Sequence, residues 1–117
     1  MAQITRHRPG PRITAGVVHN STVYLAGQLD TTTDDAYDQT VRTLKKVDEL
    51  LAECGSRKDA VLHATVHLAH VEDSAAMNKA WDEWVADGAA PARVTVQAPL
   101  VRPEARVEIT IIAAQTD

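Results

Sequence analysis

The sequence predicts a single α+β domain in which two helices pack on one face of one β-sheet. A chain of 117 residues is long enough for one hydrophobic core and too short for two. Short runs in which apolar and polar residues alternate, as in strands, fill most of the chain, and two longer segments change to the three-and-four spacing of helices. The predicted order is β-β-β-α-β-α-β-β. With both helices on one side, the other face of the sheet is left for solvent or another subunit.

Three strands are predicted at the start of the chain. Alternating runs occupy residues 3–7, 13–18 and 22–28, and the intervening segments RPGP and HNST have turn composition.

The first helix is predicted over residues 34–54. An apolar stripe recurs at helical spacing, acidic residues begin the segment, and Gly55 follows it as a C-terminal cap. The stripe consists of Tyr37, Val41, Leu44, Val47 and Leu51.

A strand and the second helix follow. Residues 60–70 alternate again, with Leu62, Ala64, Val66 and Leu68 on one face and His63, Thr65 and His67 on the other. Asp73 is the expected N-cap of a helix over residues 74–87, which Gly88 and Pro91 terminate. Its apolar stripe is Met77, Ala80, Trp81, Trp84 and Val85.

Residues 91–109 predict a β-hairpin whose second strand continues to Ile112. Val94 and Val96 share one face, as do Val107, Ile109 and Ile111, and the opposite face carries Arg93 and Glu108. The uncovered face of the sheet is therefore expected to be of mixed polarity, which favours a subunit interface containing a polar site. The residues expected on it are His63, Thr65, His67, Arg93, Thr95, Gln97, Glu108, Thr110 and Ile112.

Arg93 and Glu108 are expected opposite each other on adjacent strands, if the connecting loop centres near residues 100–101. Two interpretations follow. The pair is either a cross-strand ion pair, which contributes little when exposed, or a functional site. In such a site Arg93 grips a small carboxylate with two parallel hydrogen bonds while Glu108 handles a proton or positions water.

Composition limits the class of function. A net charge of −4 and 3% aromatic residues disfavour nucleic-acid binding, which needs basic grooves and stacking side chains. The lone Cys54 allows no intramolecular disulfide, and no stretch approaches the ~20 apolar residues of a membrane span, so a cytoplasmic protein is expected. His63 and His67 lie four residues apart in a strand, roughly 13 Å, which is too far to share a metal ion.

Three segments resemble the RidA (YjgF) family of reactive-intermediate deaminases, and especially its YoaB-like branch. AGQ at 26–28 is similar to the family's strand-ending SGQ, and AAMNKAWDEWV at 75–85 resembles its second helix. PARVTVQAPLVRPEARVEITIIAA at 91–114 is similar to its C-terminal signature, including the fifteen-residue separation of Arg93 and Glu108.

The resemblance implies a chorismate-mutase-like fold, a homotrimer with sites between subunits, and hydrolysis of 2-aminoacrylate-type enamines and imines to 2-keto acids and ammonia. It implies no metal and no cofactor. By resemblance, Arg93 binds the substrate carboxylate with help from the Gly27 backbone N–H, Glu108 orients or activates water, and Asn78 lies near the cleft.

The chain departs from the family pattern at three places. Ala26 replaces a serine, Thr95 replaces a cysteine, and Arg12 or Ile13 stands where an aromatic residue is expected. These departures leave a non-catalytic carboxylate-binding or regulatory trimer as the first alternative. An endoribonuclease or translation inhibitor is the least favoured.

Overall fold

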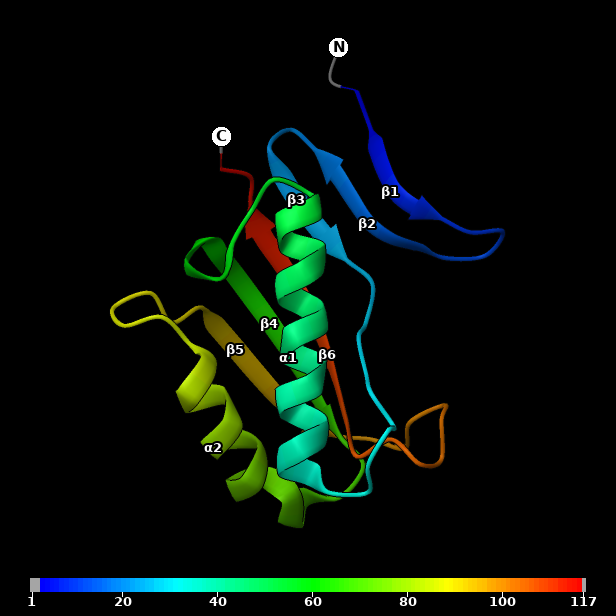
Figure 1. The fold of residues 1–117 in the computed structure, drawn as a ribbon, viewed down its shortest axis with the longest axis vertical. Helices are drawn as coiled ribbons and strands as arrows, with labels where there is room; N and C mark the ends of the chain where they lie inside the picture. The colour runs from blue at the N-terminus through cyan, green and yellow to red at the C-terminus, as the bar shows by residue number, and fades with distance from the viewer. Residues whose placement is uncertain (1–2, 117) are drawn as a thin grey trace.

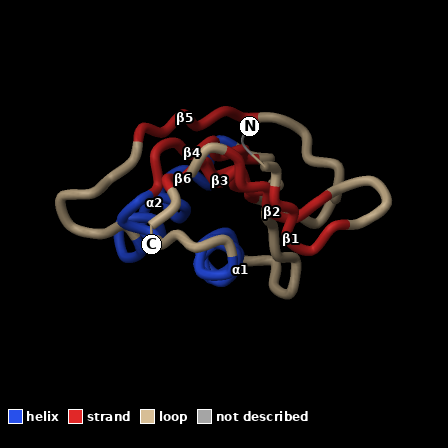
Figure 2. Tube along the Cα trace, turned by 90° about the horizontal axis from the view of Figure 1, so that it is seen from above, coloured by secondary structure: helices blue, strands red, loops and turns tan. Residues whose placement is uncertain are grey.

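A six-stranded sheet runs through the molecule in the order β1-β2-β3-β6-β4-β5, and both helices pack against the same face (Figures 1 and 2). The computed structural model describes residues 3–116. The α+β class and the two-helix layer are confirmed. The elements are β1 (Thr5–Pro9), β2 (Thr14–His19), β3 (Thr22–Leu25), α1 (Ala36–Glu53), β4 (Val61–Leu68), α2 (Ser74–Trp84), β5 (Ala92–Gln97) and β6 (Val107–Ala114). None of the helices in the described part of the chain has the length and apolar content needed to cross a membrane.

The turn between β2 and β3 is a two-residue hairpin turn. His19 pairs with Thr22, and Asn20 and Ser21 between them have φ of 52° and 62°. Positive φ at both central residues is the type I′ geometry, which matches the right-handed twist of paired strands. The predicted turn is confirmed.

Helix α1 begins and ends with the expected caps. The Asp35 carboxylate accepts a hydrogen bond from the Asp38 backbone N–H, and Gly55 follows the helix with a φ of 79°. The buried stripe is rotated relative to the predicted one, because Gln39 and Thr43 are fully buried while Val41 is 39% exposed. The Gln39 amide donates to two loop carbonyls and accepts from the Arg106 backbone N–H, so its burial leaves no amide group unsatisfied.

Helix α2 buries the predicted Met77, Ala80, Trp81 and Trp84 against the sheet. Asp73 occupies the N-cap position, but its side chain makes no capping hydrogen bond there. Its carboxylate instead accepts from the Arg106 guanidinium at 3.2 Å.

The predicted C-terminal hairpin is wrong. β5 pairs in parallel with β4, and β6 pairs antiparallel with β4 on the other side, so β4 lies between them. The crossover through α2 accounts for the parallel pairing, since β-α-β connections place consecutive strands side by side in parallel. The 98–106 loop then carries β6 back into the sheet centre, where its alternate residues are buried.

The faces of β5 are also the reverse of the prediction. Arg93 pairs in register with the buried Ala64, so Arg93, Thr95 and Gln97 lie on the helix-covered face. Val94 and Val96 lie on the open face, 44% and 39% exposed. Glu108 pairs with His67 and lies on the open face as predicted.

The open face is of mixed polarity. Besides the two exposed valines of β5 it carries Tyr24, 45% exposed, together with His63, Thr65, His67, Glu108, Thr110 and Ile112 from β4 and β6. Figure 2 shows α1 and α2 on the opposite side of the sheet.

Acid is expected to destabilise the segment that follows β3, through Asp30. Hydrogen bonds from Thr32, with a smaller contribution from Lys46, lower the pKa of Asp30 to about 2. Because this pKa lies below the unfolded value near 3.8, the stabilisation is complete above pH 4 and is lost as the pH falls through about 2. We expect Asp30→Asn to lower the free energy of unfolding by about 1 kcal/mol at pH 6, after a discount for solvent screening.

Chemical denaturation of both proteins from pH 6 to pH 2 measures this. The difference between wild type and Asp30→Asn should close towards pH 2, and a difference that stays constant would contradict the prediction. Asp59→Asn, on the protein surface, is the matched control and should change little.

Candidate active site

Arg93 projects from β5 onto helix α2. Its Nη2–H donates to Asn78 Oδ1 at 2.8 Å, its Nη1 lies 3.8 Å from Met77 Sδ, and its guanidinium carbon lies 5.0 Å from the centre of the Trp81 ring. Stacking on an aromatic face and an amide acceptor fix the plane of the guanidinium. Asn78 and Trp81 are one helical turn apart on α2, so both reach the same strand residue.

No carboxylate among residues 3–116 forms an ion pair with Arg93. A guanidinium has five N–H donors, and the contacts with Asn78 and Met77 engage two of them. Arg93 is therefore a half-buried, oriented cation with donors left for a ligand, and carboxylate is the group that its fork fits best. The predicted alternative of an Arg93–Glu108 ion pair across adjacent strands of one chain is wrong, because β4 lies between β5 and β6.

Glu108 lies on the open face against Gly27. Its Oε2 is 2.6 Å from the position that a Cβ on Gly27 would occupy, so only glycine leaves room for the carboxylate in this position. Two backbone hydrogen bonds of 2.9 Å between Gln28 and Ile109 hold the AGQ segment against β6. The predicted Gly27 and Glu108 are thus brought together.

The backbone of the AGQ segment offers a free donor. The N–H of Ala26 donates to Ala15 and that of Gln28 donates to Ile109, whereas the Gly27 N–H has no partner among the described residues. An unpaired N–H beside a carboxylate can bind one oxygen of a small polar ligand.

Within one chain the predicted residues form two groups. The Arg93 half comprises Arg93, Asn78 and Thr95 on the helix-covered face, and the Glu108 half comprises Ala26, Gly27 and Glu108 at the β3–β6 end of the open face. Arg93 and Glu108 are two strands apart across the sheet and three residues apart along it. Standard spacings then separate their Cα atoms by about 14 Å, and their side chains point to opposite faces.

Arg12 and Ile13 belong to neither half. They lie in the turn between β1 and β2, at the opposite edge of the sheet from β5, and Ile13 is 65% exposed.

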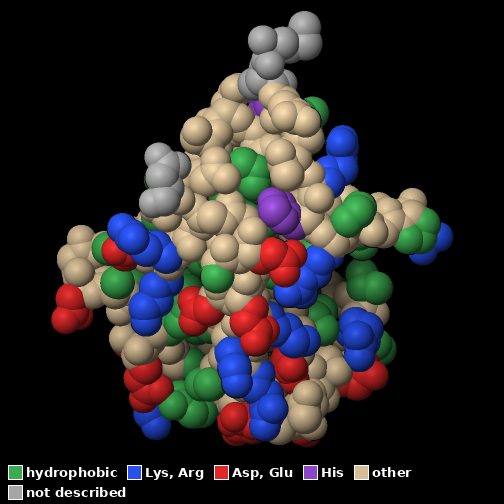
Figure 3. Space-filling model, turned by 45° about the horizontal axis from the view of Figure 1, so that its top comes forward, with side chains coloured by type: hydrophobic (Ala, Val, Ile, Leu, Met, Phe, Trp, Pro, Cys, Tyr) green, Lys and Arg blue, Asp and Glu red, His purple; other side chains and the backbone are tan. Residues whose placement is uncertain are grey.

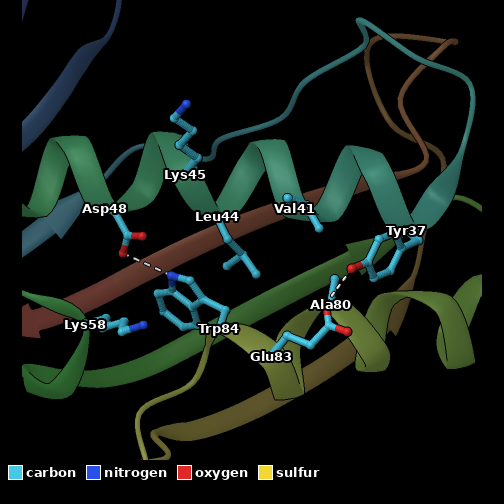
Figure 4. Close-up of a pocket in the computed structure, with 9 residues that line it drawn as sticks. All are labelled: Tyr37, Val41, Leu44, Lys45, Asp48, Lys58, Ala80, Glu83 and Trp84. Carbon is cyan, nitrogen blue, oxygen red and sulfur yellow. Dashed lines mark hydrogen bonds between the residues drawn. The ribbon is translucent and has the colours of Figure 1, made fainter.

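Two hollows of the protomer contain none of the predicted site residues. One, of about 300 Å³, lies between α1 and α2, and hydrogen bonds from Trp84 to Asp48 and from Tyr37 to Glu83 cross it (Figure 4). Burial raises the pKa of the Asp48 carboxyl there. The other, of about 460 Å³, lies under the 98–106 loop. Within residues 3–116, no three His, Cys, Asp or Glu side chains are grouped closely enough to hold a metal ion.

A family model described as Endoribonuclease L-PSP matches residues 5–115. The chain is 50% identical to the RutC family protein YoaB of Escherichia coli over 98 residues, covering 84% of this chain and 86% of that protein. It is 44% identical to a RutC family protein of Haemophilus influenzae over 112 residues, covering 94% and 97%. The chain belongs to the YjgF/RidA family. The crystal structure of NMB1025, a YjgF family member from Neisseria meningitidis, superposes with a TM-score of 0.96 at 43% identity, covering 98% and 97%.

Sequence reasoning placed Trp81 of this YjgF/RidA family member in the core and missed its second contact. The ring is buried at 5% exposure and also supports the Arg93 guanidinium. The signal was present as helical spacing, since Trp81 follows Asn78 by three residues. The contact between Trp81 and Arg93 could be inferred from this spacing only after the structure showed that Arg93 lies on the helix-covered face of β5.

Alanine substitutions at two glycines should separate activity from stability in this YjgF/RidA fold. At Gly27 the three atoms nearest to the new Cβ all belong to the flexible Glu108 side chain. We therefore expect near-normal melting, and a loss of about tenfold or more in the imine hydrolysis that the family resemblance implies, as the carboxylate is displaced. At Gly16 the new Cβ would lie 2.7 Å from the buried Cys54 Sγ. Overpacking there should cost about 1–3 kcal/mol of stability.

Melting temperature and turnover measured on both variants check this pair. A Gly27→Ala protein with wild-type turnover would show that the contact between Gly27 and Glu108 has no role in function.

Proposed function

We propose that this protein hydrolyses enamines and imines of the 2-aminoacrylate type to 2-keto acids and ammonia, at sites formed between the subunits of a homotrimer. The observation that supports it best is the Arg93 guanidinium, oriented by Asn78 and Trp81 and free of any carboxylate among the described residues. The residues that the family motif assigns to carboxylate binding and to water activation are both present.

A single site requires two copies of the chain. A 2-imino acid is only a few ångströms across, whereas the two halves of one protomer lie about 14 Å apart on opposite faces of the sheet. A heterologous contact, in which one surface of a subunit meets a different surface of the next, can bring the Arg93 half of one copy to the Glu108 half of its neighbour. Where the rotation between subunits closes, such contacts form a ring, and the family resemblance implies a ring of three.

The proposed reaction is addition of water followed by elimination of ammonia. Arg93 and the Gly27 N–H hold the substrate carboxylate, which fixes the imine carbon. Glu108 takes a proton from water as the oxygen attacks that carbon, forming a carbinolamine. Glu108 returns this proton to the imine nitrogen, which completes the carbinolamine. It then transfers the hydroxyl proton to the same nitrogen, so the C–N bond breaks, ammonia leaves and the oxygen becomes the keto group. Glu108 thus acts first as base and then as acid. An enamine enters the same route after protonation of its terminal carbon to the imine.

Release of keto acid and ammonia tests this function directly. An amino-acid oxidase generates the imine in situ, and the protein should raise the rate of keto-acid and ammonia formation above the spontaneous rate. No acceleration with any of several 2-imino acids would remove the deaminase assignment. An RNA-cleavage assay on the same preparation tests the activity named by the matching family model.

A carboxylate-binding trimer without turnover is the second candidate, and Ala26 and Thr95 are the observations that favour it. Both replace polar family side chains within the two halves. Calorimetric titration with a 2-keto acid distinguishes the two candidates, because binding without any acceleration would support this one.

An RNA-directed activity has less support. The face drawn in Figure 3 has Lys and Arg interspersed with Asp and Glu, and the net charge is −4. An RNA groove typically carries a continuous basic patch.

The protein is expected to be a trimer in solution at micromolar concentration. Exposed Tyr24, Val94 and Val96 on the open face provide apolar surface for a subunit contact. Light scattering coupled to gel filtration should report three times the 12.7 kDa chain mass. A monomer would contradict both the trimer and the shared site.

A further inference from the structure

His67 of β4 is the closest titratable neighbour of Glu108 across the sheet. The two residues pair in register on antiparallel strands, and both side chains lie on the open face. Directly paired residues have Cβ atoms about 4.5–5.5 Å apart, so a direct or water-bridged hydrogen bond is within reach.

The imidazole of His67 carries an unsatisfied polar atom. Its Nδ1 is shielded from solvent and has no hydrogen-bond partner within residues 3–116. A buried polar atom that stays unpaired is destabilising, so this one needs an explanation, and functional sites are among the places where such groups are found.

Glu108 is the acidic residue that pairs with His67 across β4 and β6. From β5, His67 faces Val96, and along β4 its neighbours on the same face are Thr65 and then His63. Arg106, which directly precedes β6, donates to the Asp34 backbone carbonyl and to the Asp73 carboxylate. Of the two residues that pair with His67 on the neighbouring strands, Val96 and Glu108, only Glu108 is charged.

We infer that His67 is a positioning residue for Glu108, and this inference rests on the proposed function. In the structure the Glu108 carboxylate leans over Gly27, on the side of β6 away from His67. Rotation about the Glu108 side chain, or one bridging water, brings the carboxylate to the imidazole N–H. The His67 N–H then holds the Glu108 carboxylate in the orientation that it needs as the base, as the third group of a catalytic triad orients its partner.

NMR of the histidine ring signals at constant pH tests the coupling without reference to activity. Glu108→Gln should change the ring chemical shifts of His67, since the group that accepts from its N–H has been replaced. His63 is the matched control, because it lies on the same strand and face but pairs with Ile112, and its ring signals should not move. His67→Asn assigns the signal. His67 ring signals that are the same in wild type and Glu108→Gln would overturn the inference.

Turnover provides the second measurement. His67→Phe should lower kcat by about tenfold to a hundredfold, as when a partner that orients a reacting group is removed. It should also remove one inflection from the pH dependence of kcat, with little change in KM. His67→Gln restores a hydrogen-bond donor but cannot titrate, so it should recover part of kcat and still lack that inflection. If the wild type has no deaminase activity, the proposed function fails and the NMR experiment alone decides the coupling.

Discussion

Arg93→Ala is expected to reduce kcat/KM for 2-imino acids by about 10²-fold or more while the trimer stays folded. The guanidinium is the oriented cation that would hold the substrate carboxylate, so its loss removes both affinity and the fixed position of the imine carbon. Loss of the contacts with Asn78 and Trp81 should cost only about 1 kcal/mol of stability. Arg93→Lys should recover little, because an ammonium supplies charge without the planar fork.

Activity and melting temperature measured on the same preparations check this result. Arg42→Ala is the matched control, since Arg42 pairs with Asp38 on the exposed surface of α1 and should leave turnover unchanged. An Arg93→Ala trimer that melts normally and turns over at the wild-type rate would show that Arg93 has only a structural role.

Glu108→Gln is expected to lower kcat by about 10²- to 10⁴-fold while the binding of 2-keto acids persists. Glutamine has nearly the same shape and fits over Gly27, but it cannot accept the proton of the attacking water. The Arg93 half is unchanged in this variant, so calorimetry should give a dissociation constant within a few-fold of wild type. Wild-type turnover by Glu108→Gln would remove the carboxylate from the mechanism.

Mixing the two variants tests whether each site is shared between subunits. Trimers are assembled from equal amounts of Arg93→Ala and Glu108→Gln chains. A shared site is intact when a Glu108→Gln chain supplies its Arg93 and an Arg93→Ala chain supplies its Glu108. Each condition is met half of the time, so about a quarter of wild-type activity should return. Sites built within one chain would recover none, and this outcome would contradict the shared site even if both single variants are inactive.

The sequence alone was sufficient to locate the helices and to select the candidate residues of the site. Helical periodicity located α1 and α2, and Gly55 marked the end of α1, because these features depend on contacts within a few residues. Family motifs selected Gly27, Asn78, Arg93 and Glu108, which the structure brings together in two pairs.

Only the tertiary structure decided how those pairs are arranged. An alternating strand states which residues share a face, but not which face is covered, and β5 at the sheet edge is exposed on both sides. Strand order likewise depends on long-range pairing, so nothing local to residues 91–109 reveals that β4 separates β5 from β6. Because β4 lies between β5 and β6, Glu108 pairs with His67 rather than with a residue of β5. Arg93 packs against Trp81, and the two halves of the proposed site lie on opposite faces of one sheet.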